Sequence, residues 1–241
     1  ASAQIILTGT SYTQNFDSSE DGLPAGWSVS TSASITSLGT TSAFTTAKTN
    51  WSATTTDTAF RNIASNNGSP SDTSGTQSAN SNRALGWRPL NAGTRDGAVT
   101  LELTNTLGFE NFNLSVTLFT ANDVTGVLTY DLEYRVGAIG SFTSLGTYTT
   151  DTPFSSTTFT ANSVTLSALN NQSASVFIRI RGTNANSVTA GNLDTIGIDN
   201  FSLSYTALAA VPEPSTYAAI LGGVALVSVV AVRRRKRAKV A

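Results

Sequence analysis

Cysteine and histidine are both absent from the 241 residues. The lack of cysteine excludes disulfides, thiolate zinc sites and thiol nucleophiles. The lack of histidine removes the usual general base and the commonest metal ligand. Serine and threonine are plentiful, but the only lysine before residue 211 is Lys48, in a polar segment. We therefore expect no enzyme, and a secreted hydrolase remains an alternative.

Methionine is also absent, including an initiator, which indicates a processed N-terminus. Ala1-Ser2-Ala3 fits the small-residue pattern that precedes a signal-peptidase cut. The sequence therefore predicts export, with Gln4 as the first residue of the mature chain.

Charge is scarce and unevenly placed. Residues 211–241 carry six basic residues and one acid, whereas residues 1–210 carry eight basic and fourteen acidic residues. An acidic body offers little attraction to phosphate, so we expect no nucleic-acid partner. The basic residues follow an apolar run, where they indicate membrane topology.

Several segments alternate apolar and polar residues with a period of two, which is typical of half-buried strands. The clearest is 128–136, where leucine, tyrosine and valine alternate with Thr129, Asp131, Glu133 and Arg135. Strands are predicted near residues 98–103, 112–119, 127–136, 142–148, 175–181 and 195–205. Many short strands and no helical period before residue 211 predict an all-β, antiparallel β-sandwich over residues 1–206. Residues 40–82 are predicted as long loops with one or two short strands.

The last predicted strand breaks its own alternation. Ile196 and Ile198 share one face, but Phe201, Leu203 and Tyr205 are out of phase with them by one residue. A β-bulge at Asp199-Asn200 would bring both sets to the same face.

Acidic residues offer two candidate sites. Asp131 and Glu133 lie on one face of a predicted strand and could form the pair of carboxylates that a glycosidase needs. With Arg135 on the same face, a solvent-exposed polar surface is the simpler interpretation. Calcium binds oxygen ligands, and acidic residues lie near both the first and the last strand. If these two strands pair, Asp199 would come close to an acid near the first strand, one of Asp17, Glu20 and Asp21. Turn chemistry remains the alternative, since Asp and Asn favour turns. No other cofactor is expected.

Tryptophan is the natural stacking surface for a sugar ring. Trp27 and Trp87 have apolar neighbours and are expected in the core. Trp51 stands among polar residues and is the candidate for glycan stacking.

Two stretches of the body resemble extracellular jelly-roll domains of the carbohydrate-binding-module and MAM-like kind. FDSSEDGLPAGW at residues 16–27 is similar to their opening, and SVFIRIRG with DTIGIDNFSLSYT is similar to their closing strands. The resemblance implies a jelly-roll-like fold rather than a particular ligand.

The end of the chain has three parts in order. A proline box is followed by sixteen uncharged residues, 217–232, and then by a basic block. As a helix the uncharged run is about 24 Å long, short for a hydrocarbon core of ~30 Å, but flanking arginines can snorkel and the bilayer can thin. The positive-inside bias then places the basic block in the cytoplasm: Arg233, Arg234, Arg235, Lys236, Arg237 and Lys239.

These three parts resemble the PEP-CTERM sorting signal of Gram-negative bacteria. The resemblance implies export, handling by exosortase at the inner membrane, and association with extracellular polysaccharide, biofilm or floc matrix. It assigns the recognition element to Val211, Pro212, Glu213, Pro214 and Ser215. The implied organisation is an ectodomain at 1–206, a linker at 207–216, a single transmembrane helix at 217–232 and a cytoplasmic tail at 233–241. A non-catalytic surface or matrix protein is the main expectation, and a carbohydrate-binding adhesin or lectin is the alternative.

Overall fold

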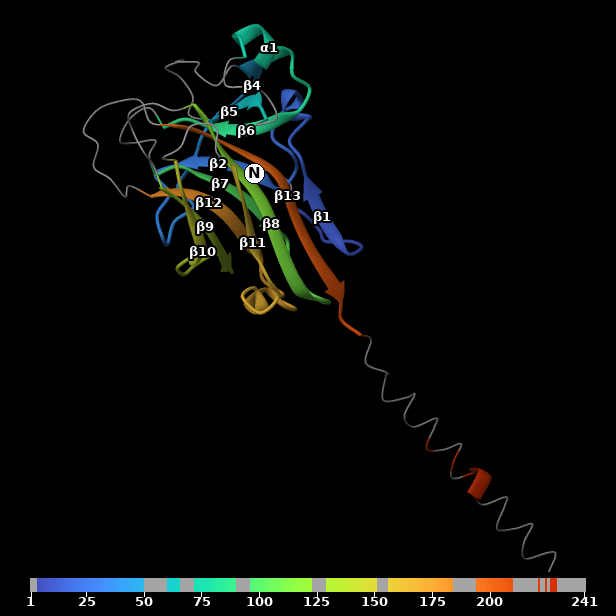
Figure 1. The fold of residues 1–241 in the computed structure, drawn as a ribbon. Coiled ribbons are helices and arrows are strands. Elements are labelled where there is room, and N and C mark those ends of the chain that lie inside the picture. The colour runs from blue at the N-terminus through green and yellow to red at the C-terminus, as the bar shows by residue number, and fades with distance from the viewer. Residues whose placement is uncertain are drawn as a thin grey trace, which may run out of the picture. The chain divides into compact units, whose positions relative to one another are not determined.

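The computed structural model describes residues 4–49, 60–65, 72–89, 96–122, 129–150, 156–183 and 194–209, together with 221, 224 and 226–228. The chain divides into two compact units, Ala1–Ala207 and Leu208–Ala241. The first unit is a β-sandwich (Figure 1). Ala1–Ala3, Trp51, the proline box and the basic block were singled out in the sequence and lie outside the described residues.

One sheet has seven strands in the order β11-β8-β13-β6-β5-β4, with β1 also paired to β13. β13 is its central strand, because it pairs with β8 along one edge and with β6 and then β1 along the other. All these pairs are antiparallel except β4 with β5. The bounds are β1 Ser11–Gln14, β4 Phe44–Thr49, β5 Phe60–Ala64, β6 Arg83–Trp87, β8 Phe109–Asn122, β11 Ser156–Ala161 and β13 Thr195–Ala207.

The facing sheet has six strands in the order β10-β9-β12-β7-β2-β3. The chain changes sheet at most connections after β6, as jelly-roll topologies do. The bounds are β2 Trp27–Thr31, β3 Thr40–Thr41, β7 Ala98–Leu103, β9 Thr129–Val136, β10 Thr143–Thr149 and β12 Val176–Thr183. Short 3-10 turns, η1 Ser19–Asp21 and η2 Ser167–Leu169, join strands.

The core lies between the two sheets and is built from the apolar half of each alternating strand. Trp27 and Trp87 are 2% and 0% exposed, so their assignment to the core is confirmed. Each makes edge-to-face contacts with other aromatic rings, such as Trp27 with Phe201 at 5.1 Å between ring centroids. The all-β sandwich is thereby confirmed, and the six predicted strands correspond to β7, β8, β9, β10, β12 and β13.

The predicted bulge in the last strand is confirmed. The register with β8 shifts between Asp199 and Ser202, and Asn200 adopts a left-handed φ of 48°. Ile196, Ile198 and Phe201 are consequently all buried. The bulge falls where the other partner of β13 changes from β6 to β1, so it also aims the strand toward a new neighbour.

Residues 40–82 contain more regular structure than the expected loops with one or two strands. They include β3, β4, β5 and the helix α1 at Ser74–Ala79. β5 is buried along its whole length although its sequence, FRNIA, is half polar. Its burial is accommodated because Arg83 of β6 donates from Nε to the Asn62 side chain at 2.7 Å and caps carbonyls of the α1 segment.

The second unit, Leu208–Ala241, is helical at residues 221, 224 and 226–228. The Ser228 hydroxyl donates to the Val224 carbonyl at 2.8 Å, the i to i−4 bond of a serine inside a helix. Among the residues that the structure describes, no helix has the length and hydropathy needed to cross a bilayer.

Candidate functional site

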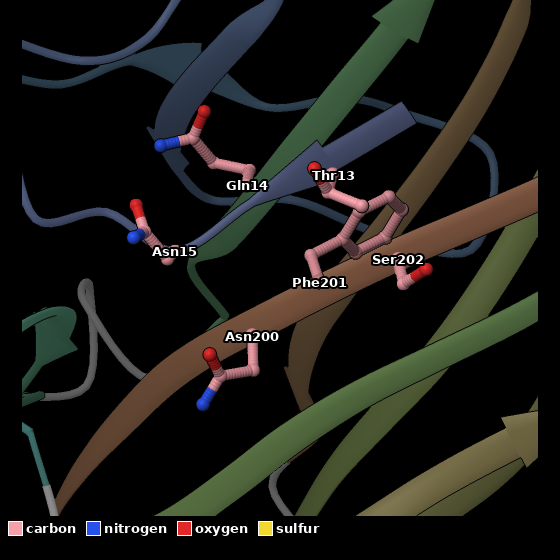
Figure 2. A pocket seen from close by; sticks show the side chains of 6 residues that line it. All are labelled: Thr13, Gln14, Asn15, Asn200, Phe201 and Ser202. Carbon is pink, nitrogen blue, oxygen red and sulfur yellow. The ribbon is translucent and has the colours of Figure 1, made fainter. Parts of the chain in front are cut away.

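A polar hollow of about 390 Å³ lies on the outer side of the seven-stranded sheet, between β1 and β13. Figure 2 shows the amides of Gln14 and Asn15 on the β1 side and that of Asn200 on the β13 side. Asn200 takes its place there because the bulge turns it outward, while Asp199 beside it is buried. Thr13 and Ser202 supply hydroxyl groups, and Phe201, whose ring packs against Trp27 in the core, also contributes to the lining.

A second hollow of about 280 Å³ adjoins the first and shares Ser202 with it. The two are connected by a line of four cross-strand partners, which we call the hydroxyl row: Thr13, Ser202, Ser115 and Thr160 on β1, β13, β8 and β11. Neighbouring members lie about 4.8 Å apart, the spacing of paired strands. No charged side chain lines either hollow among the described residues. This surface offers hydrogen-bond donors and acceptors without charge.

A third hollow, about 470 Å³, lies on the outer side of the other sheet, beside β2 and β7. Leu23 and Leu38 contribute apolar surface, Ser28 and Thr100 hydroxyls, and Glu102 a carboxylate. Glu102 accepts a hydrogen bond from Gln4 Nε2 at 2.5 Å. This hollow is more mixed in chemistry than the hydroxyl row.

The acidic strand β9 is not the solvated face that its sequence predicts. Glu133 is 1% exposed and binds two arginines of β12, Arg179 at 2.6 Å and Arg181 at 2.8 Å. Burial lowers the pKa of Arg179 to about 10, with Glu133 opposing the shift. Both carboxylate oxygens of Glu133 are taken up by these two guanidinium groups and are not turned toward a substrate site with Asp131. The structure thus gives no support to this pair as glycosidase carboxylates.

A loop covers these charges, which is the feature that sequence reasoning missed. Arg179 donates to the carbonyls of Ser34 and Ser37 at 2.6 and 2.8 Å, and its guanidinium carbon lies 3.4 Å from the centre of the Phe142 ring. Arg135 donates to the Thr36 carbonyl at 3.1 Å. The loop contributes backbone carbonyls, so its side chains give no sign of the contact. The only available signal was three arginines on adjacent strands around one glutamate.

The predicted approach of the first and last strands is confirmed, because β1 pairs with β13. Asp17 and Asp199 are close enough for the charge of Asp17 to act on Asp199. Burial raises the pKa of Asp199 to about 6, and hydrogen bonds from Ser65 and the Asn200 N–H partly oppose this. Asp17 accepts the Arg83 N–H at 2.8 Å.

Among the described residues, the other two acids of the predicted calcium group, Glu20 and Asp21, have no observed contact with Asp199. Glu20 forms an ion pair with Lys48 at 3.0 Å. Within the described part of the chain, no group of three or more acidic side chains is arranged to hold a metal ion.

Comparison with known proteins gives different results for the C-terminal tail and for the sandwich. Residues 210–236 match the model of the PEP-CTERM protein-sorting motif. No curated protein sequence matches the chain.

Several solved structures are similar to this chain, among them carbohydrate-binding modules and adhesin domains. A xylan-binding domain of family 22 from Paenibacillus barcinonensis has 12% identity and a TM-score of 0.45, covering 87% of this chain and 99% of its own. A family 61 carbohydrate-binding module bound to β-1,4-galactotriose has 13% identity, a TM-score of 0.44, and coverage of 80% and 99%. A cleaved adhesin domain of Lys-gingipain from Porphyromonas gingivalis has 13% identity, a TM-score of 0.45, and coverage of 83% and 100%.

At these identities and TM-scores the likeness assigns neither a family nor a ligand. The assignment that the comparisons do make lies outside the sandwich: the chain carries a PEP-CTERM protein-sorting motif at residues 210–236.

Proposed function

We propose that the protein is an exported, non-catalytic surface or matrix protein that exosortase sorts through its C-terminal signal. The observation that carries this proposal is the match of residues 210–236 to the sorting motif. The β-sandwich is then the exported domain, and the tail (residues 211–241) is its sorting signal. Extracellular polysaccharide or a biofilm matrix is the proposed destination.

The proposed topology follows from the order of the three parts of the tail. Residues 217–232 span the inner membrane as one helix, with the six basic residues after residue 232 in the cytoplasm. The helical positions around Ser228 support this part of the proposal. In this topology Val211 to Ser215 lie outside the bilayer, and a proline on each side of Glu213 favours an extended backbone there.

Replacing Pro212, Glu213 and Pro214 together by alanine tests this function. Membrane insertion should persist because hydropathy and charge barely change, whereas processing should stop and full-length protein should accumulate in the membrane. Thr216→Ala, just after the recognition element Val211–Ser215, is the matched control and should be processed normally. Equal processing of the triple variant and wild type in a host with active exosortase would show that the tail is only an anchor.

Glycan binding is a second candidate function, and the hydroxyl row with its two hollows favours it. Uncharged hydroxyl and amide groups that line a hollow are suited to the hydroxyl groups of a neutral polysaccharide. Trp51 remains the proposed stacking residue. Ser202→Tyr would fill both hollows at once and should abolish retention on insoluble neutral polysaccharides. Thr147→Tyr, on exposed β10 of the other sheet, should leave retention intact; equal retention of all three proteins would remove the candidate.

Calcium stays a structural proposal for Asp17 and Asp199, with Glu20 and Asp21 as the other acids of the predicted group. The described residues fit it in part, since the charge of Asp17 acts on Asp199, but calcium needs six to eight oxygen ligands. If it binds, millimolar calcium should raise the melting temperature by mass action relative to chelator. The shift should disappear in Asp199→Asn, and no shift in wild type would end this proposal.

A further inference from the structure

One end of the sandwich is defined by the last residues of β13 and three segments that meet there. Ala207, the last residue of β13, pairs with Phe109 at the start of β8. The N-terminal segment joins through the Thr104 N–H, which donates to the Ile5 carbonyl at 2.8 Å. The η2 segment joins through the Asn171 N–H, which donates to the Phe109 carbonyl at 2.8 Å. Figure 1 shows the arrowhead of β13, the start of β8 and the η2 coil at this same end. We call it the exit end, because the chain leaves the sandwich here.

The exit end exposes large apolar side chains. Ile6 is 74%, Leu107 58% and Val164 81% exposed. Ile139 is 87% exposed in the turn from β9 to β10, which lies at the same end because the Gly137 N–H donates to the Ser175 carbonyl just before β12. Among the described residues of the sandwich, the other residue exposed to a similar degree is Ile35, in the loop that covers β9 and β12. Single exposed apolar residues are ordinary, but four from separate segments share the end from which the sorting signal continues.

Charge at the exit end is nearly absent. Residues 4–8, 104–113 and 162–172 contain one acid, Glu110, and no basic residue. A partner with strong charge of either sign has little to recognise there. The surface is better suited to an uncharged boundary between polar and apolar material, such as the headgroup region of a zwitterionic bilayer.

The linker keeps the exit end near the bilayer, if the topology under the proposed function holds. Nine residues, 208–216, separate Ala207 from Tyr217, where the proposed spanning helix begins, which makes ten steps along the chain. Ten extended residues reach at most ~35 Å, and part of that length lies within the headgroup layer. β8 alone has fourteen residues, about 45 Å. The linker therefore gives the exit end a higher effective concentration at the membrane surface than the far end of the sandwich.

We infer that, before processing, the exit end of the sandwich rests on the non-cytoplasmic surface of the membrane that holds the tail, with Ile6, Leu107 and Val164 in the lipid interface. This inference rests on the proposed function for its membrane-spanning tail. The contact places the proline box at the membrane surface, where a membrane-embedded enzyme meets it. Three side chains bind weakly without the covalent link, so removal of the tail releases the sandwich.

Single cysteines carrying a polarity-sensitive fluorophore test the inference, since the chain has no cysteine of its own. Leu107→Cys and Val164→Cys report on the exit end, and Thr149→Cys is the control, an exposed position where β10 ends beside the start of β9 at the opposite end of the sandwich. The full chain is reconstituted in phosphatidylcholine vesicles that contain a lipid-borne quencher. Labels at 107 and 164 should be quenched at least twofold more than the label at 149. The difference should be unchanged at high salt, because the contact is apolar.

Insertion of the tail is measured in the same vesicles, as resistance to alkaline extraction. If the tail inserts but all three labels are quenched equally, the inference is overturned and the proposed topology stands. If the tail does not insert, the proposed topology fails and the inference fails with it. Loss of the quenching difference at high salt would also overturn the inference, because it would show an electrostatic contact.

Discussion

At the scale of single residues, Glu133 shows where strand alternation stops being informative. Alternation correctly placed Asp131, Glu133 and Arg135 on the face of β9 that points away from the core. It could not show that this face is covered, because the cover is a serine- and threonine-rich loop that contributes backbone carbonyls. Tryptophans were easier to assign, since apolar neighbours on the same strand indicated burial for Trp27 and Trp87.

Glu133→Gln should lower the free energy of unfolding by about 3–5 kcal/mol, because Arg179 would stay buried without its countercharge. Asp131→Asn is the control on the same strand face. Asp131 is half-buried and accepts a hydrogen bond from Ser144, so its replacement should cost less than about 1 kcal/mol. Chemical denaturation followed by tryptophan fluorescence measures both. Equal losses would contradict the central role of Glu133.

Asp199 should make stability fall as the pH rises from about 4 to about 6. Its pKa is about 6 in the folded protein and ordinary in the unfolded chain, so the folded state binds the extra proton in this interval. A difference of about two pKa units corresponds to at most ~3 kcal/mol. Asp199→Asn cannot titrate and should flatten the profile of melting temperature against pH over this interval. A variant profile as steep as that of wild type would assign the dependence to another group.

At the scale of secondary-structure elements, the sequence predicted the strands with clear alternation and missed those without it. β5 is buried on both sides and half polar, so it has no period of two. β1 and β11 are short edge strands with many hydroxyl residues, which also favour loops. The bulge in β13 was predictable because hydrophobic phase is a local property of one strand. The role of the bulge, at the point where β13 changes partner from β6 to β1, could be seen only from the strand pairing in the structure.

The bulge should depend on the left-handed conformation of Asn200. Asn200→Gly should be tolerated, whereas Asn200→Val should cost about 1–2 kcal/mol because a β-branched residue is strained at this φ. Ser204→Val, on the same strand outside the bulge, should change stability by less than about 0.5 kcal/mol. Denaturation midpoints give the comparison; a neutral Asn200→Val would mean that the residue is not held in this conformation.

At the scale of the whole molecule, the sequence was most informative where function depends on a local pattern. The sorting signal is linear, so thirty residues sufficed to predict it, and comparison confirmed the motif at residues 210–236. The surface of the sandwich is different. Thr13, Ser202, Ser115 and Thr160 are far apart in the sequence and form a row only through three strand pairings. No periodicity in one strand could have assembled them.

The mass of the C-terminus of protein recovered from cells with active exosortase tests the central claim most directly. The account predicts a mature product that retains β13 through Ala207, because β13 is the central strand of its sheet. The same product should end near the proline box and lack Arg233 to Lys239. A mature product that still carries the basic block would contradict the account.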